Sequence, residues 1–253
     1  MSKKEIIRLL NDQKEIFGDE LFITNEELQK SRPLSIVKEK EIEYKVEKVV
    51  TEKPKEEPAL FAEKKDDWQL TESLEKLNNL ICNCTKCTLH KGRNKFVFGS
   101  GNPNADALVI GEGPGAEEDK QGLPFVGRAG KLLTDMLKAI KFERDEVYIG
   151  NIVKCRPPEN RTPLPEEMDT CLPYLKKQIE IIKPKLILCL GLTAAKGLLK
   201  KRESLTNLRG KVFEYENIKV VVTYHPAALL RNPNWKKPAW QDLQMFRKLY
   251  DES

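Results

Sequence analysis

The sequence predicts an α/β fold of three layers, α/β/α, around a central and mainly parallel four-stranded sheet. Short apolar runs typical of buried strands alternate along the chain with longer stretches typical of helices. Elements in this order form a parallel sheet covered by helices on both faces. No internal repeat is visible, and the chain has no run of about 18 apolar residues that could span a membrane.

Four apolar runs are the predicted strands, and the helical stretches lie around them. The strands are expected at 107–110 (ALVI), 147–153 (VYIGNIV), 186–190 (LILCL) and 220–224 (VVVTY). The helices are expected at 70–81, 130–140, 165–182, 193–199 and 240–250. The first helix would lead into a cysteine cluster, three would connect successive strands, and the last would close the chain.

The folded domain is predicted to span residues 68–253, after two segments of different composition. Residues 1–30 carry apolar positions at near-helical spacing, which predicts a short helical segment. Residues 31–67 are rich in charge, lack glycine and are interrupted by proline. Such a segment buries too little to order itself, so we expect a flexible linker. Within it, the alternating stretch 42–50 could form a strand on a partner.

The composition sets only loose limits on function. The 253 residues carry a formal net charge of +5, which permits binding to a polyanion but does not argue for it. The start, MSKKEIIRLLNDQKEIFGDE, is too charged for a secretory signal. We therefore expect a cytoplasmic protein with no membrane attachment.

Four of the six cysteines have the spacing of metal ligands. Cys84 and Cys87 form a C-x2-C pair, and Cys155 and Cys171 form a second pair further along. Clustered cysteines in a reducing compartment point to metal binding, although four unrelated buried cysteines are the alternative. Four thiolates suit either zinc or an iron–sulfur cluster, and spacing does not choose between them.

The other two cysteines have different interpretations. Cys82 lies close enough to Cys84 to compete with it, so the spacing leaves the first ligand open. Cys189 lies inside a predicted strand and is expected in the core.

Polar segments follow three of the predicted strands. The glycine-rich turn GEGPG begins at Gly111, Asn151 lies within or beside the second strand, and His225 follows the last strand. Ligands of open α/β sheets bind at the carboxyl ends of the strands. We therefore expect these three segments to converge on one pocket.

Each of these segments has a chemical and a purely structural interpretation. The glycines could let the backbone approach a ligand, or could make a tight turn. Phe125 could stack on a planar base or fill its own core. The Asn151 amide has a donor and an acceptor side, so it could read the hydrogen-bonding edge of a flipped-out base, or cap a strand. His225 is one of only two histidines, and its position after a strand suits a pocket.

Two further segments could contact DNA. Arg156 and Arg161 lie in a proline-stiffened loop that could grip a DNA backbone or be solvated. Leu229 and Leu230 form an apolar tip next to Arg231, and this tip could wedge into a base stack.

Four segments together resemble the family 4 uracil-DNA glycosylases, iron–sulfur enzymes of bacteria and archaea. The segments are CTKCTLHKGR, GEGPGAEEDKQGLPFVGRAGKLL, NIVKCRPPENRTPLP and HPAALLR. The resemblance implies the α/β/α fold of these enzymes and nucleoid association in a prokaryotic cytoplasm. It implies an enzyme that flips uracil out of DNA and hydrolyses its N-glycosidic bond in base-excision repair. It also implies a [4Fe-4S] cluster on Cys84, Cys87, Cys155 and Cys171.

The resemblance implies a role for each residue at the strand ends. Phe125 would stack on the uracil, Asn151 would hydrogen-bond its edge, and His225 would stabilise the uracil anion as it leaves. Gly111, Glu112 and Gly113 are expected around the sugar and the attacking water. The segment Leu229, Leu230 and Arg231 would enter the duplex.

The residue that activates water is left open. The best-known uracil glycosylases use an aspartate where this chain has Gly113. Glu112, Glu118 or Asp119 could substitute, and we favour weak, late assistance from Glu112.

Two other functions are compatible with the sequence. One is a non-catalytic iron–sulfur module that binds DNA, and the other is a zinc-stabilised enzyme that acts on nucleotides. The expected partner is uracil-containing DNA, single- or double-stranded, bound by a monomer. Residues 1–67 lie outside the resemblance and could tether a repair or replication protein.

Overall fold

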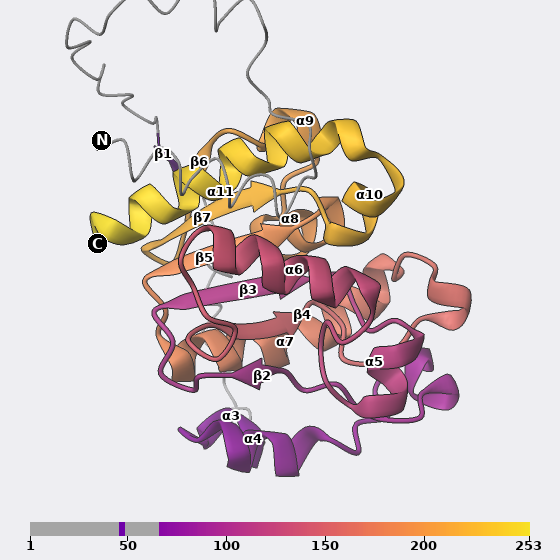
Figure 1. The fold of residues 1–253 in the computed structure, drawn as a ribbon. Helices are drawn as coiled ribbons and strands as arrows, with labels where there is room; N and C mark the ends of the chain where they lie inside the picture. Colours follow the sequence, from indigo (N-terminus) through magenta and orange to yellow (C-terminus); the bar gives the residue numbers. More distant parts are fainter. Residues whose placement is uncertain (1–45, 49–65) are drawn as a thin grey trace, which may run out of the picture.

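The computed structural model describes residues 46–48 and 66–253, which form the predicted three layers of α/β/α (Figure 1). The predicted N-terminal helical segment lies outside the described residues, and so does the predicted linker apart from 46–48 and 66–67. No helix in the described part is long and apolar enough to cross a membrane.

One sheet forms the centre of the molecule, and its four middle strands are parallel. The middle strands β3 (Ala107–Gly111), β4 (Tyr148–Asn151), β5 (Leu186–Leu190) and β7 (Ile218–Thr223) match the four predicted strands. The prediction of four strands in total was wrong, because the sheet has seven in the order β1-β6-β7-β5-β3-β4-β2. The added strands are β1 (Val46–Lys48), β2 (Ser100–Gly101) and β6 (Val212–Tyr215).

The added strands have an identifiable structural basis. β6 and β7 form an antiparallel hairpin whose turn residues, Glu216 and Asn217, have φ values of 50° and 66°. This left-handed backbone suits a two-residue hairpin, but the turn has no glycine that would signal it in the sequence. β1 pairs in parallel with β6. Residues 46–48, within the stretch expected to form a strand on a partner, thus form a strand of the chain's own sheet.

Helices cover both faces of the sheet. One face carries α4 (Leu74–Ile81), α7 (Pro165–Ile182) and α8 (Leu192–Leu199). The other carries α6 (Arg128–Ala139), α10 (Pro226–Arg231) and α11 (Lys236–Asp251). The shorter elements are α3 (Asp67–Leu70), α5 (Ala116–Gln121), α9 (Leu205–Leu208), η1 (Thr88–Gly92), η2 (Pro158–Asn160) and η3 (Pro233–Trp235).

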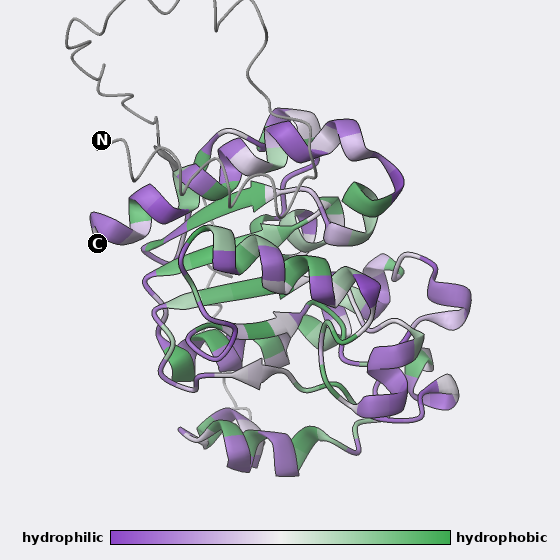
Figure 2. Cartoon of the chain, viewed as in Figure 1, coloured by the Kyte–Doolittle hydropathy of each residue, from purple (hydrophilic) through white to green (hydrophobic). Residues whose placement is uncertain are grey.

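Alternation along the strands creates two cores. In β3, Leu108 and Ile110 pack with one core, and Ala107 and Val109 pack with the other. Figure 2 accordingly shows hydrophobic strands between helices whose outer faces are hydrophilic. Because the middle strands are parallel, their carboxyl ends lie at one edge of the sheet, where the polar segments follow.

Candidate functional site

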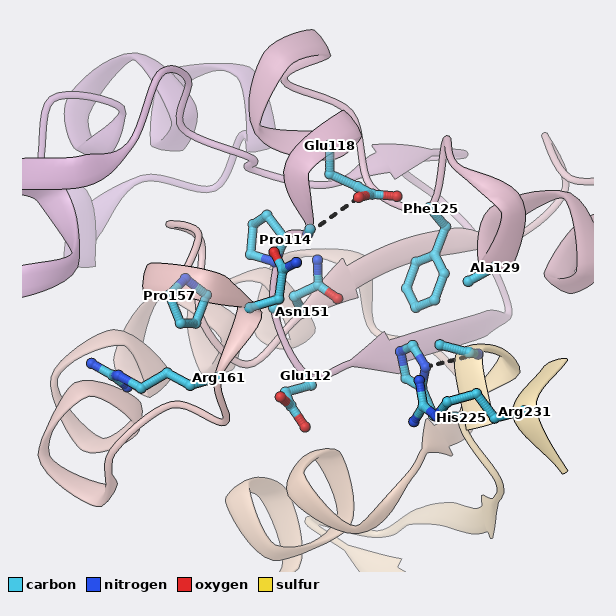
Figure 3. A pocket seen from close by; sticks show the side chains of 14 residues that line it. Glu112, Pro114, Glu118, Phe125, Ala129, Asn151, Pro157, Arg161, His225 and Arg231 are labelled. Atoms are coloured by element: carbon cyan, nitrogen blue, oxygen red, sulfur yellow. Dashed lines mark hydrogen bonds between the residues drawn. The ribbon is translucent and has the colours of Figure 1, made fainter. Parts of the chain in front are cut away.

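A pocket of about 390 Å³ opens at this edge of the sheet (Figure 3). Its lining includes Glu112 after β3, Asn151 at the end of β4 and His225 after β7. Phe125 from the loop between α5 and α6 completes one wall. The volume is in the range of small-molecule sites. The structure therefore brings together the segments that the sequence placed at the strand ends.

The side chain of Asn151 has an unpaired polar atom inside this pocket. Asn151 is 2% exposed, and its Oδ1 has no hydrogen-bond partner in the described part of the chain. Buried polar atoms are almost always hydrogen-bonded, so an unpaired oxygen at a pocket wall is available to bind a ligand. The alternative of a strand-capping hydrogen bond for this oxygen is not observed.

Gly111 lets β3 approach this amide. A Cβ atom at Gly111 would lie 2.4 Å from Oδ1 of Asn151 and 2.6 Å from Cζ of Phe125. Only glycine leaves room for both side chains. Gly113 is similarly confined, because a Cβ there would lie 2.6 Å from Cγ2 of Val153.

Phe125 is held in a strained backbone conformation. Its φ is 52°, a region that costs energy for a residue with a side chain. Arg144 donates hydrogen bonds to the carbonyls of Pro124 (2.7 Å) and Phe125 (3.0 Å), which fixes the loop. The ring of Phe125 is 7% exposed, and its centroid lies 5.5 Å from that of His225. Phe125 thus both lines the pocket and packs into the core.

Of the three carboxylates expected near the water, two are engaged elsewhere. Glu118 accepts hydrogen bonds from the backbone N–H groups of Gly115 (3.1 Å), Val126 (3.0 Å) and Gly127 (3.2 Å). It therefore joins the two pocket loops, which the sequence had not indicated. Asp119 is fully buried and accepts hydrogen bonds from the backbone N–H (2.9 Å) and side-chain amide (2.5 Å) of Asn94. Glu112 and Glu118 both line the pocket, but within the described residues only Glu112 of the three carboxylates makes no side-chain hydrogen bond.

His225 presents a defined face to the pocket. Its Nδ1 accepts a hydrogen bond from the N–H of Ala227 (3.2 Å), so the ring caps the N-terminus of α10. Burial lowers the pKa of His225 to about 4, and the nearby Arg231 lowers it as well. The ring is therefore neutral at pH 7 and carries its proton on Nε2, which leaves one N–H donor free.

The two leucines of the predicted tip have different environments. Leu229 is fully buried in the core beneath α10, so its expected entry into the duplex was wrong. Leu230 is 41% exposed, and Arg231 lines the pocket. Successive residues of a helix point in different directions, so one of two adjacent leucines faces the core while the other faces solvent.

The four predicted ligand cysteines lie in one packed cluster, which includes the loop that follows β4. Burial raises the pKa of the Cys155 thiol, and the nearby Cys87 and Cys84 raise it further. Burial likewise raises the pKa of Cys171 to about 12, with added contributions from Cys155 and Cys87. Three segments thus bring their thiols together: the segment after α4 that contains Cys84 and Cys87 (the cysteine hook), the loop after β4, and α7.

Donor groups surround these sulfur atoms. Arg93 donates from Nη1 to Sγ of Cys155 (3.2 Å) and to the carbonyl of Cys84 (2.7 Å). The hydroxyl of Tyr174 donates to Sγ of Cys84 (3.3 Å). A cation and hydrogen-bond donors stabilise thiolates, so the donor set fits a thiolate-bound group. In the described residues, no three His, Cys, Asp or Glu side chains are arranged to hold a single metal ion.

The remaining cysteines are separate from this group. Sγ of Cys82 points back to the carbonyl of Asn79 (3.7 Å), whereas Sγ of Cys84 faces Tyr174. Cys189 is fully buried in β5, which confirms its expected place in the core.

A buried carboxylate that the sequence did not single out supports the arginine loop. Glu167 is 1% exposed and binds Arg161 through both carboxylate oxygens at 2.8 Å. It also accepts hydrogen bonds from Thr88, next to the cysteine hook, and from the backbone N–H of Leu164. Glu167 therefore orients Arg161, which lines the pocket, from the first turn of α7. The Leu-Pro-Glu-Glu start of α7 is the only sequence signal for this role.

Replacing Glu167 with glutamine should lower the free energy of unfolding at pH 7 by about 1–3 kcal/mol. The hydrogen bonds from Arg161 lower the pKa of Glu167 to about 2, so its stabilisation is present above its unfolded pKa. That stabilisation should disappear as the pH falls from about 4.5 to about 2. Urea unfolding at several pH values checks this. The exposed neighbour Glu166, changed to glutamine, is the matched control and should leave stability nearly unchanged. An equal loss in both variants would contradict the prediction.

Comparison with known proteins agrees with this arrangement. Residues 98–244 match the family model described as the uracil DNA glycosylase superfamily. The type-4 uracil-DNA glycosylase of Pyrobaculum aerophilum is 46% identical over 181 residues, covering 68% of this chain and 92% of the relative. Those of Archaeoglobus fulgidus and Thermotoga maritima are 43% and 48% identical, covering 70% and 64% of this chain and 94% and 85% of the relatives. The chain belongs to the uracil-DNA glycosylase superfamily.

Proposed function

We propose that this protein is a uracil-DNA glycosylase that hydrolyses the N-glycosidic bond of a flipped-out uracil and leaves an abasic site. The observation that carries this proposal is the unpaired Oδ1 of Asn151, which shares a pocket with the ring of Phe125 and the neutral ring of His225. A pocket with a stacking ring and an amide that can donate and accept suits an extruded pyrimidine. The similarity to type-4 uracil-DNA glycosylases supports the same substrate.

The pocket residues divide recognition from bond cleavage. Phe125 would stack on the uracil, and the Asn151 amide would pair with its O4 and N3 edge. As the bond between C1′ and N1 breaks, its electron pair leaves with the base. The Nε2–H of His225 would then donate a hydrogen bond to O2 and stabilise the developing negative charge.

Glu112 would act on the sugar side of the pocket. Its side chain lines the pocket and makes no hydrogen bond within the described residues, unlike those of Glu118 and Asp119. It can stabilise positive charge on the sugar and orient a water whose oxygen bonds to C1′. The proton released by that water goes to solvent or to the uracil anion, which balances the reaction. A strong base is not required when the leaving group departs first.

We also propose that Cys84, Cys87, Cys155 and Cys171 hold a [4Fe-4S] cluster. The neighbouring thiols and the hydrogen-bond donors around them suit thiolate ligands, and the similarity to type-4 uracil-DNA glycosylases supports the same group. The cluster would supply a covalent crosslink between the hook, the loop after β4 and α7. That loop also carries Arg161, so the crosslink would stabilise one wall of the pocket.

The proposed setting is DNA in the prokaryotic nucleoid. The protein would act as a monomer on uracil-containing DNA, single- or double-stranded. The segment 1–67 would be available for a repair or replication partner.

The test is a glycosylase assay with an oligonucleotide that contains one uracil. After incubation, alkali should cleave the strand only at the abasic site. A matched thymine oligonucleotide should stay intact, and an Asn151→Ala/His225→Ala double variant should show little cleavage. A folded protein with the brown colour of an iron–sulfur cluster could still bind this DNA and leave the uracil in place. That result would instead favour a non-catalytic DNA-binding module.

Replacing Leu230 with alanine should lower kcat/KM on duplex DNA by about tenfold, because an apolar wedge contributes part of the unstacking energy. Single-stranded DNA should be affected less, since it has no paired stack to open. Steady-state assays on both substrates give the ratio. Leu80 on α4 is similarly exposed (50%), and Leu80→Ala should change neither value. Equal losses on both substrates would remove Leu230 from strand opening.

A further inference from the structure

A fully buried lysine lies between the uracil-reading residue and a cysteine of the cluster. Lys154 is 0% exposed and stands three positions after Asn151 and one before Cys155. Lysines are almost never fully buried, because removing the ammonium from water is costly unless it is well paired. Lys154 does not line the pocket, and the reaction proposed above does not use it.

The ammonium of Lys154 binds two fixed acceptors. Nζ donates to the main-chain carbonyl of Asn151 (3.0 Å) and to Oε1 of Gln178 on α7 (2.6 Å). Gln178 is itself fully buried, and its Nε2 donates to the carbonyl of Phe98 (2.9 Å) and lies 3.4 Å from the Tyr148 hydroxyl. These bonds use the Gln178 N–H groups and leave its oxygen aimed at Lys154. The network thereby joins the end of β4 to α7.

The end of β4 is where the position of the Asn151 amide is set. Just beyond it, the N–H groups of Ile152 and Val153 donate to the carbonyls of Gly111 (3.0 Å) and Glu112 (3.1 Å). The two strand ends that form the pocket floor are therefore coupled. The Asn151 side chain has only two rotatable bonds, so a shift of its backbone shifts the amide with it. The hydrogen bonds that Lys154 makes to the Asn151 carbonyl and to Gln178 on α7 resist such a shift.

We propose that Lys154 is a positioning residue that fixes the Asn151 amide for uracil by tying its backbone carbonyl to Gln178. The role of Asn151 in reading uracil is part of the proposed function, and this inference rests on it.

The first test is a double-mutant cycle between Lys154 and Asn151. Lys154→Met keeps the length of the side chain but removes the donors, and it should lower kcat/KM for uracil-containing DNA by about tenfold, mainly through kcat. In an Asn151→Ala background the same change should have little further effect, because the amide that Lys154 positions is gone. If Lys154→Met lowered kcat/KM by the same factor in the wild type and in the Asn151→Ala background, the inference would be overturned. A general structural role of Lys154 would act equally on both backgrounds.

The matched control is another buried lysine, Lys177, which lies on α7. Lys177 is 6% exposed and pairs with Glu180 (2.8 Å), away from Asn151. Lys177→Met should leave kcat/KM close to that of the wild type. If Lys154→Met does not fold, Gln178→Met removes the other end of the same link. It should give a smaller loss that is again absent in the Asn151→Ala background.

A second measurement separates this inference from the proposed function. Hydrogen exchange reports on the Ile152 and Val153 amides whether or not the protein excises uracil. Lys154→Met should speed exchange of these two amides relative to Lys177→Met. Unchanged exchange would overturn the inference and leave the proposed function standing. A wild type that binds no uracil and excises none would overturn the proposed function, and with it the role of Lys154 in uracil reading, whatever the exchange result.

Discussion

Replacing His225 with alanine should lower kcat for uracil excision by about 10²–10³, the usual loss when a donor to a developing anion is removed. The neutral ring carries its remaining N–H toward the pocket, because Ala227 occupies Nδ1. Single-turnover excision with enzyme in excess measures this step without product release.

A second variant separates chemistry from folding at this position. His225 also caps α10, and loss of a cap costs about 1 kcal/mol. His225→Asn keeps a capping oxygen but lacks the ring, so it should retain most of the stability and lose the same activity. A His225→Asn enzyme with the wild-type kcat would show that the ring is not the anion donor.

The pH dependence gives an independent check on the state of this ring. A free histidine has a pKa of 6.5, but burial lowers that of His225 to about 4. The folded protein therefore keeps His225 neutral throughout the range in which a free histidine titrates. The plot of wild-type kcat against pH should therefore show no break near pH 6.5 that arises from His225. Any break in that range should also be present in the His225→Asn variant. A break that His225→Asn abolishes would mean that the protonated ring takes part.

Replacing Gly111 with alanine should lower uracil excision by about 10² or more while the protein stays folded. The added Cβ would lie 2.4 Å from Oδ1 of Asn151 and 2.6 Å from the Phe125 ring, so one of these two must move. A displacement of about 1 Å in a reading group is enough for a loss of this size. Excision kinetics and the affinity for free uracil should fall together, since both need the same two side chains.

Gly92 provides the matched control for this substitution. A Cβ at Gly92 would meet nothing within 4 Å, and its backbone does not need glycine. Gly92→Ala should therefore leave excision and stability unchanged. If Gly111→Ala were as active as Gly92→Ala, the tight approach of β3 to Asn151 would not matter for catalysis.

The sequence by itself determined the middle of the fold and the edge where the pocket lies. The four parallel strands are short apolar runs, and α7 was predicted with the bounds 165–182 that it has. Periodicity and burial are local properties of a chain, so they can be recognised in it. Convergence of the GEG turn, Asn151 and His225 also followed, because parallel strands end at the same edge.

The outer parts of the sheet depended on interactions that are not local. β6 exists as one arm of a hairpin with an unusual turn, and β1 exists because β6 offers it an edge. Neither strand has an apolar run long enough to predict a strand from the sequence.

Only the tertiary structure decided what each polar side chain does. Glu112, Glu118 and Asp119 were all candidate water partners in the sequence, with Glu112 favoured. In the structure, three backbone N–H groups occupy Glu118, whereas Glu112 lines the same pocket without such bonds. Leu229 and Leu230 are adjacent and identical, yet α10 buries one and exposes the other. Nothing in the sequence distinguishes Lys154 from the other lysines, whereas the structure shows that it donates hydrogen bonds to Gln178 and to the Asn151 carbonyl. A hydrogen bond depends on atoms from distant segments, so its partner is set by how those segments pack together.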